Sequence, residues 1–160
     1  MNSIEKLKLT SKSEKETIDI GYNIGLNLDN SDVVLLYGEM GAGKTRITAG
    51  IAKGIGSEMT VRSPTFVIIN EYPGPKILFH CDFYRLNNLF EAYDLDIESR
   101  FDKGIVVVEW PDTFEEIFTQ NVLKVKISIP ENPDSRNILL ESTNKRTNDL
   151  IGNIKQNYEK

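Results

Sequence analysis

The segment at residues 38–45 constrains this chain more than any other part of its sequence. It reads GEMGAGKT and matches the pattern G-x-x-x-x-G-K-[ST] at every position. The glycines let successive backbone N–H groups turn inward around a phosphate, because no Cβ stands in the way. An apolar run at residues 33–37 precedes the segment, and Ile47, Ile51 and Ile55 follow it at the spacing of one helix face. A buried strand, a glycine loop and an amphipathic helix in this order predict a phosphate-binding loop.

The loop also supplies side chains that suit a nucleotide with magnesium. Lys44 is expected to bridge the β- and γ-phosphates, and the Thr45 hydroxyl to take one magnesium position. The helix that follows points its positive N-terminus at the same anion. A glycine turn without a ligand is the alternative, which the neighbouring strand and helix disfavour. We predict that ATP and Mg²⁺ are bound by Gly38, Glu39, Met40, Gly41, Ala42, Gly43, Lys44 and Thr45.

The remaining pattern alternates between strands and helices. Further strands are expected at residues 6–10, 66–72, 77–84, 104–109, 122–129 and 137–140. Helices are expected at residues 13–28, after the glycine loop, weakly at 87–98, briefly at 111–118 and in the polar C-terminal segment. Ser13 and Glu16 have the spacing of a capping box at the start of the first helix. This order predicts one domain over residues 1–160, a three-layer α/β sandwich like that of P-loop NTPases with a largely parallel central sheet. The last two strands, separated by ENPDSR, predict a C-terminal hairpin at the sheet edge.

A second acidic ligand for magnesium is expected at the end of a neighbouring buried strand. Four apolar residues at 105–108 end at Glu109, which suits this role. Aspartate is more usual there, and the longer glutamate either holds the ion directly or orients water. A surface glutamate at a strand end is the alternative.

Three polar residues alternate along the expected strand at 77–84. His80, Asp82 and Tyr84 share one face of it, and the other face is apolar. His80 is the only histidine, and one histidine does not make a metal site, so we expect a hydrogen-bonded structural role for it. Asp82 is the stronger catalytic candidate, either positioning the attacking water or supporting the magnesium ligands. Whether Asp82 or Glu109 orients the water stays open.

Two further residues have both a functional and a structural interpretation. Thr65 lies in SPTF, where switch-like loops of P-loop proteins reach across the γ-phosphate, so it would bind magnesium or sense that phosphate. Pro64 alone also accounts for a turn before a strand. Trp110 follows Glu109 directly, and either packs at the end of the sheet or belongs to a partner surface.

Composition limits the setting in which the chain works. The formal net charge is −5 and the pI about 5.0, so binding to DNA or RNA without a partner is disfavoured. No apolar run approaches the roughly 20 residues that span a bilayer, and the first residues do not resemble a signal peptide. Cys81, the only cysteine, cannot form an internal disulfide. We therefore expect a cytoplasmic protein that does not associate with membranes.

Taken together, four segments resemble the bacterial TsaE (YjeE) family in order and spacing. They are GEMGAGKT, SPTF, HCDFYRL and VVVEWP. The resemblance extends from Thr17 to Arg136 and Asn137, and the later segments make it more specific than the glycine loop alone. Members of this family are small ATPases needed for threonylcarbamoyladenosine in tRNA. The resemblance thus implies a weak ATPase that its partners activate.

The resemblance also implies roles for single residues and for partners. It implies that Thr45 and Glu109 bind magnesium, that Asp82 and Thr65 support hydrolysis with Lys44, and that Arg136 lies near the nucleotide. The segment near residues 10 and 11 would also touch the nucleotide, with no residue assigned. TsaB and TsaD are the family's partners, and TsaD transfers the threonylcarbamoyl group to the adenosine next to the anticodon. The chain would therefore meet tRNA only through the TsaB–TsaD assembly.

Two departures from the family pattern lie within or beside the glycine loop. Met40 replaces the more usual leucine, and Arg46 stands where a second threonine is frequent. Met40 sits at a position whose backbone makes the contact, and Arg46 follows the magnesium ligand. Neither departure changes the expectation that a nucleotide binds.

Three other functions are alternatives to this one. A small-molecule kinase usually brings an arginine-rich lid over the donor phosphates, whereas only Arg136 and Arg146 follow Glu109. A GTPase usually carries N-K-x-D after a buried strand, and NKRT at residues 144–147 fails at its last position. A nucleotide-gated assembly subunit, whose hydrolysis is incidental, overlaps with the ATPase and is separated from it only by experiment.

Overall fold

The computed structural model describes residues 4–58, 60–61 and 68–158. The strands are β1 Lys6–Ser11, β2 Asp32–Tyr37, β3 Ile69–Tyr72, β4 Ile77–Asp82, β5 Gly104–Glu109, β6 Asn121–Ser128 and β7 Arg136–Glu141. The helices are α1 Glu14–Gly25, α2 Lys44–Gly54, α3 Leu89–Asp94 and α4 Lys145–Gln156, with short 3₁₀ helices η1 Ile97–Arg100 and η2 Glu115–Ile117. In these described residues, no helix combines the length and apolar character needed to cross a membrane.

All the described strands form one sheet, whose centre is parallel. The order is β1-β7-β6-β2-β5-β4-β3. Strands β6, β2, β5 and β4 run parallel, whereas β7 and β3 run antiparallel to their neighbours. The inner strands β2 and β5 are almost wholly buried and rich in Val and Leu, as expected for strands covered on both faces. The predicted α/β sandwich with a largely parallel central sheet is confirmed.

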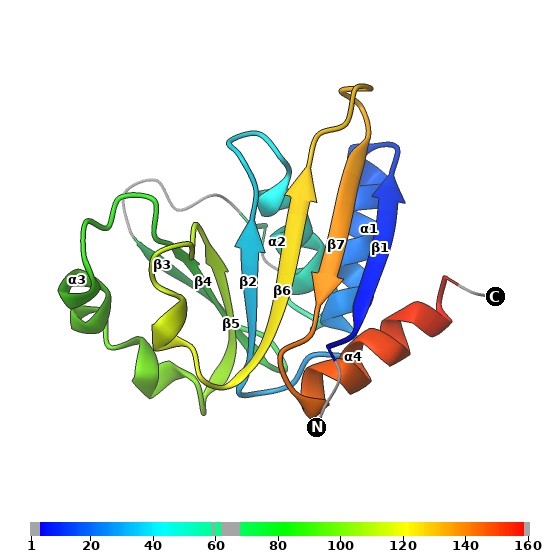
Figure 1. Ribbon diagram of the computed structural model, residues 1–160. Coiled ribbons are helices and arrows are strands. Elements are labelled where there is room, and N and C mark those ends of the chain that lie inside the picture. Colours follow the sequence, from blue (N-terminus) through cyan, green and yellow to red (C-terminus); the bar gives the residue numbers. More distant parts are fainter. Residues whose placement is uncertain (1–3, 59, 62–67, 159–160) are drawn as a thin grey trace.

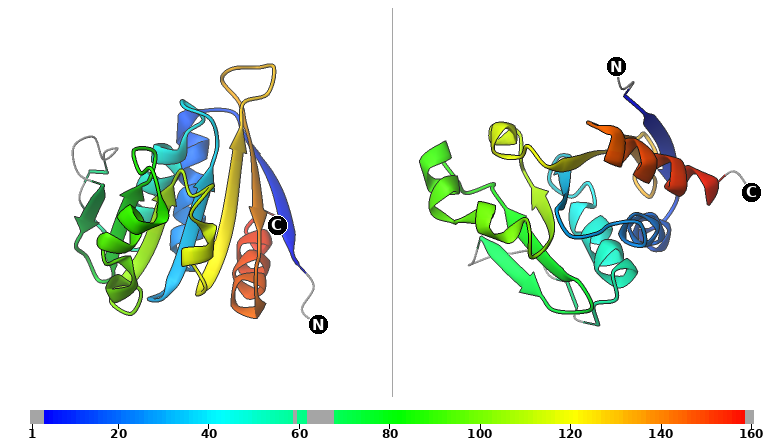
Figure 2. Two further views of the ribbon diagram at one scale, coloured as in Figure 1. Left: turned by 60° about the vertical axis from the view of Figure 1, so that its left-hand side comes forward. Right: turned by 90° about the horizontal axis from the view of Figure 1, so that it is seen from below.

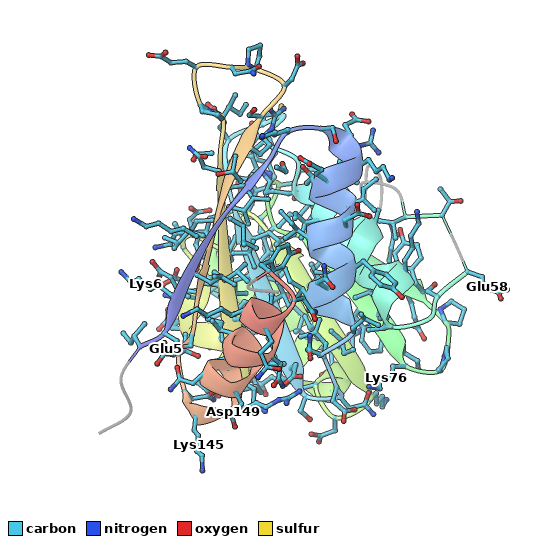
Figure 3. The ribbon with its side chains drawn as sticks, turned by 90° about the vertical axis from the view of Figure 1, so that its right-hand side faces the viewer. Glu5, Lys6, Glu58, Lys76, Lys145 and Asp149 are labelled. Carbon is cyan, nitrogen blue, oxygen red and sulfur yellow. The ribbon has the colours of Figure 1, made fainter. Side chains whose placement is uncertain are left out.

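Helices lie on both sides of the sheet (Figure 1). A buried apolar cluster lies between each face of the sheet and the elements that cover it. One face packs against α1, α2 and α4, for example through Ile24, Ile51 and Ile154. The other face packs against α3 and the short helices η1 and η2, with Phe83 and Phe114 meeting edge to face at 5.2 Å. The two further views in Figure 2 show these layers from other sides, and Figure 3 looks onto α1 and α4, with Lys145 and Asp149 at the surface.

Helices α1 and α2 approach each other unusually closely because glycines line their contact. A Cβ on Gly21 would lie 2.3 Å from the Ile47 carbonyl oxygen, and one on Gly50 would lie 2.0 Å from the Ile18 carbonyl oxygen. Real Cβ atoms do not approach that closely, so these positions admit only glycine. The contact fixes the start of α1 relative to the loop that precedes α2.

The N-terminal ends of α1, α3 and α4 are capped by side chains, with Asn88 accepting from the Glu91 N–H at the start of α3. Ser13 accepts a hydrogen bond from the Glu16 N–H at 3.1 Å, as the sequence predicted, and the Glu16 carboxylate reaches back to the Lys12 N–H. Asn144 and Thr147 form a full capping box at the start of α4. The segment that failed the guanine-recognition pattern is therefore a helix cap.

Two predictions about the fold need correction. The C-terminal hairpin β6–β7 exists but is not at the sheet edge, because β1 pairs with β7 and forms the edge itself. Residues 111–118 do not form an α-helix. A turn, in which the Phe114 N–H bonds the Pro111 carbonyl oxygen at 2.8 Å, leads into the short 3₁₀ helix η2. This path buries Phe114 and Phe118 against Phe83.

Several expected boundaries also shift. Helix α1 ends at Gly25, and Leu28 enters the core from the following turn. Strand β4 ends at Asp82, where the Phe83 N–H turns to bond the Glu109 carbonyl oxygen at 3.0 Å. Strand β3 begins at Ile69, and residues 62–67 of the expected strand and loop lie outside the described residues.

Candidate nucleotide-binding site

The glycine loop connects the end of β2 to the start of α2. Gly41 and Gly43 adopt positive φ angles of 84° and 111°, which favour glycine because a Cβ would meet the backbone. Gly43 is the N-cap residue of α2, and the next residue, Lys44, begins the helix. The loop therefore leads directly into the N-terminus of α2, where the first backbone N–H groups of a helix lack intrahelical partners and favour an anion.

Lys44 lies against the loop, with its ammonium group held by several partners. Its side chain is buried, and Nζ donates to the carbonyl oxygens of Gly38 at 2.5 Å and Glu39 at 3.2 Å. Nζ also lies 3.9 Å from the centre of the Trp110 ring. Burial lowers the pKa of Lys44, and the negative charges of Glu109 and Asp82 oppose that shift.

The two acidic candidates meet at the carboxyl ends of neighbouring strands. Asp82 ends β4, Glu109 ends β5, and the parallel register places them opposite each other. Burial raises the pKa of Asp82 above its ordinary value, a shift opposed by the hydrogen bond from the Tyr84 N–H at 2.9 Å and increased by the negative charge of Glu109. Ligands of open α/β sheets commonly bind at this end of the strands.

His80 is buried in the core next to Glu109 and does not line the cavity that Asp82 and Glu109 line. It is fully buried, and its Nε2 lies 2.5 Å from Oε2 of Glu109. The prediction of a hydrogen-bonded histidine is therefore confirmed for one ring nitrogen. In the part of the chain that the structure describes, the other nitrogen, Nδ1, has no hydrogen-bond partner.

These elements enclose a cavity of about 820 Å³. Its wall consists of residues 12–14, Thr17, residues 40–46, Asp82, Tyr84, Glu109, Trp110, Pro133, Asp134 and Arg136. The glycine loop and the β6–β7 loop, which both contribute to this wall, extend beyond the same end of the sheet (Figure 1). Gly38 and Glu39 are not part of the wall, and their carbonyl oxygens bind Lys44 from behind it.

Arg136 joins the β6–β7 hairpin to the glycine loop. Its Nε donates to the Ala42 carbonyl oxygen at 2.8 Å and a terminal nitrogen donates to the Gly41 carbonyl oxygen at 3.3 Å. The same guanidinium group bonds the carbonyl oxygens of Pro133 and Ser135. Arg136 therefore lines the predicted nucleotide cavity and also supports the shape of the loop.

The start of α1 contributes residues to the wall that the sequence did not identify individually. Lys12, Ser13, Glu14 and Thr17 line the cavity, and Thr17 is fixed by a 2.7 Å hydrogen bond with Ser11. The family resemblance implied that the segment near residues 10 and 11 touches the nucleotide, but it assigned no residue there. Thr65 lies outside the described residues, so its predicted role is not tested.

Two candidate oxygen ligands for a magnesium ion lie on separate elements. Thr45 at the start of α2 and Glu109 at the end of β5 line the same cavity. Among the described residues, no group of three or more His, Cys, Asp or Glu side chains is arranged to hold a metal ion. This donor set fits magnesium bound to a nucleotide, because that ion keeps several waters and takes further ligands from phosphates.

The fold and the cavity define a protein of the P-loop-like α/β class, with its site at the carboxyl ends of the parallel strands. The family model described as Threonylcarbamoyl adenosine biosynthesis protein TsaE matches residues 11–138 of the 160. The chain belongs to the TsaE family.

Individual relatives agree with this assignment. The tRNA threonylcarbamoyladenosine biosynthesis protein TsaE of Streptomyces coelicolor is 39% identical over 114 residues, which cover 68% of this chain and 76% of the relative. The protein of the same name from Bacillus subtilis is 37% identical over 126 residues, 78% of each chain. A crystal structure of YdiB from Bacillus subtilis superposes with a TM-score of 0.79 at 29% identity, covering 99% of this chain and 100% of that one.

Proposed function

We propose that this chain binds and hydrolyses ATP with magnesium as a subunit of the machinery that makes threonylcarbamoyladenosine in tRNA. The observation that carries the proposal is the single cavity in which the glycine loop, Lys44, Thr45, Asp82 and Glu109 meet. The names of the relatives supply the pathway. The lone cysteine, free and buried, is in keeping with work in the cytoplasm.

The loop residues bind and orient the phosphates in this proposal. The N-terminus of α2 and the loop N–H groups beside it would bind the β-phosphate, except the Ala42 N–H, which bonds the Glu39 carbonyl oxygen at 3.0 Å. Lys44 would exchange its bonds to Gly38 and Glu39 for the β- and γ-phosphates. Arg136 keeps the carbonyl oxygens of Gly41 and Ala42 directed away from the anion. Lys44 and the loop N–H groups would thereby position the phosphates and stabilise their negative charge in the transition state.

Magnesium, when bound, neutralises charge between the β- and γ-phosphates, and Thr45 and Glu109 would hold it. Asp82 is the acid that we assign to the attacking water, because Glu109 already uses one oxygen on His80. The raised pKa of Asp82 makes its carboxylate a stronger base, and therefore better able to accept a proton near neutral pH. Thr65 remains a predicted contributor to hydrolysis.

The partners in this proposal are TsaB and TsaD. The chain is acidic, with a net charge of −5, which fits contact with tRNA through that assembly and not directly. Hydrolysis would then serve the assembly between rounds of tRNA modification, and activity of the isolated chain would be weak.

Magnesium-dependent ATP hydrolysis tests the proposal, measured on the purified chain alone and with the TsaB–TsaD pair. We expect slow hydrolysis alone, faster hydrolysis with the pair and none with Lys44→Ala. Lys53→Ala is the matched control, because Lys53 is an exposed residue of the same helix that is not part of the cavity wall. Transfer of the γ-phosphate to a small-molecule acceptor, with no response to the pair, would favour a kinase instead.

A different variant tests the alternative that the chain is a nucleotide-gated assembly subunit whose hydrolysis is incidental. Glu109→Ala removes a proposed magnesium ligand and leaves the phosphate loop in place. If partner binding persists while tRNA modification stops, hydrolysis is required. If modification continues without hydrolysis, nucleotide binding alone suffices and the enzymatic part of the proposal is wrong.

A further inference from the structure

His80 is a polar residue in an apolar layer of the core. It lies in the middle of β4, paired in register with Val107 of β5, and its side chain is 0% exposed. Leu78 and Tyr72 lie in the cluster on the same face, and the Tyr72 ring centre is 6.4 Å from that of the imidazole. Burying such a ring costs free energy unless its nitrogens are hydrogen-bonded. An apolar side chain would fill this position without that cost.

The contacts of His80 are directed at one atom. Nε2 lies 2.5 Å from Oε2 of Glu109, a carboxylate that is itself only 4% exposed. A carboxylate accepts and does not donate, so Nε2 carries the hydrogen. Nδ1 has no hydrogen-bond partner within the described segments. The imidazole therefore makes its one polar contact with Glu109, and packing alone does not explain its presence.

The geometry places the two residues on different sides of the cavity wall. Glu109 lines the cavity, whereas His80 does not. His80 thus reaches the carboxylate from the core side and occupies Oε2, which leaves Oε1 as the oxygen able to face a ligand. Glutamate has one more rotatable bond than aspartate, so a free Glu109 would sample more orientations.

We propose that His80 is a positioning residue that fixes the Glu109 carboxylate for magnesium. The inference rests on the proposed function, in which Glu109 is a magnesium ligand. His80 does not touch the nucleotide or the ion. It holds Glu109 in the one orientation that presents Oε1 to the cavity, as partners behind metal ligands commonly do.

The test measures how much magnesium strengthens ADP binding. ADP affinity is measured by calorimetry with Mg²⁺ and with a chelator, for the natural chain, His80→Leu and His80→Gln. Leucine fills the apolar position without a donor, whereas glutamine keeps an N–H donor. In His80→Leu we expect the factor by which Mg²⁺ strengthens ADP binding to fall at least about tenfold. ADP affinity in chelator should not change. His80→Gln should recover part of the loss.

The same measurement in the Glu109→Gln variant tests whether His80 acts through Glu109. In Glu109→Gln the magnesium effect is already reduced, and adding His80→Leu is expected to reduce it no further. Equal, full magnesium effects in His80→Leu and the natural chain would overturn the inference and leave the proposed function intact. If the natural chain itself shows no magnesium effect, the proposed function fails and the inference fails with it.

A spectroscopic measurement keeps the inference testable if His80→Leu does not fold. Because His80 is the only histidine, selective ¹⁵N labelling of histidine gives the signals of one ring. We expect hydrogen on Nε2, and a shift of that signal when Mg²⁺ is added to the ADP complex but not when ADP is added alone. A ring with hydrogen on Nδ1 only, or an Nε2 signal unmoved by Mg²⁺, would overturn the inference.

Discussion

The ammonium group of Lys44 lies 3.9 Å from the centre of the Trp110 ring, and Tyr84 packs on the same indole with its ring centre 5.0 Å away. Trp110 has a positive φ of 59°, an uncommon conformation for a bulky residue. This conformation brings the ring over the site instead of into the sheet. Trp110 is therefore part of the cavity wall, which the sequence had left open between packing and a partner surface.

This relationship predicts an optical signal for nucleotide binding. Trp110 is the only tryptophan, and ATP would draw the Lys44 ammonium group from the ring toward the phosphates. We expect a saturable change in tryptophan fluorescence on addition of ATP with Mg²⁺, shared by Lys53→Ala and absent from Lys44→Ala at the same concentrations. Fluorescence that stays constant up to saturating ATP would contradict this account of Lys44.

The close contact of α1 and α2 predicts a strong effect of one methyl group. Gly50→Ala would place a Cβ 2.0 Å from the Ile18 carbonyl oxygen, so the helices must move apart. We expect a loss of about 1–3 kcal/mol or more in the free energy of unfolding, measured by urea denaturation. Because α1 carries part of the cavity wall, ATP affinity should fall as well.

Gly152→Ala is the matched control for that substitution. Gly152 lies in α4, and a Cβ there would meet no atom within 4 Å. Alanine in an open helical position is expected to stabilise the chain by about 0.5–1 kcal/mol. Equal losses in both variants would show that helix contact is not what restricts Gly50.

The raised pKa of Asp82 predicts how stability changes with pH. Asp82 stays protonated to a higher pH in the folded chain than in the unfolded chain. The contribution of this residue to the free energy of unfolding therefore falls as pH rises from the ordinary Asp pKa of about 3.9 through the raised value. Asp82→Asn removes this cost and keeps an oxygen for the Tyr84 N–H. We expect the variant to unfold at higher temperature than the natural chain at pH 7–8. The difference should shrink near pH 4, and a variant less stable at pH 8 would contradict the prediction.

Cys81 gives a chemical measure of folding. Its thiol is fully buried, and burial raises its pKa to about 12, so roughly one thiol in ten thousand is ionised at pH 8. We expect no reaction with a thiol reagent in the folded chain at pH 8 and one reactive thiol per chain in denaturant. Fast reaction of the folded chain would contradict the placement of Cys81 in the core of β4.

The glycine loop and the strand ends could be predicted because each carries a local signal. The pattern at residues 38–45 determines the loop, and the apolar runs ending at Tyr37 and Glu109 mark strands buried on both faces. Alternation along β4 correctly separated Phe79 and Cys81 from His80. Such short-range patterns depend only on which face a side chain occupies.

The features of the fold and site that the sequence did not predict depend on contacts between segments distant in the chain. The edge position of β1 follows from its pairing with β7, which lies about 130 residues away in the sequence, and no local pattern encodes that choice. At residues 111–118, a turn and the 3₁₀ helix η2 take the place of an α-helix, and Phe114 and Phe118 pack on Phe83, a residue of another segment. The link from Arg136 to Ala42 likewise joins segments that only the folded sheet brings together.

Binding of ATP with magnesium tests the central claim most directly, measured by calorimetry on the natural chain and on Lys44→Ala. The account predicts one ATP per chain, and a loss of about tenfold or more in affinity when the charged hydrogen bonds of Lys44 are removed. ATP that does not bind the natural chain, or that binds Lys44→Ala equally well, would show that this cavity is not a nucleotide site.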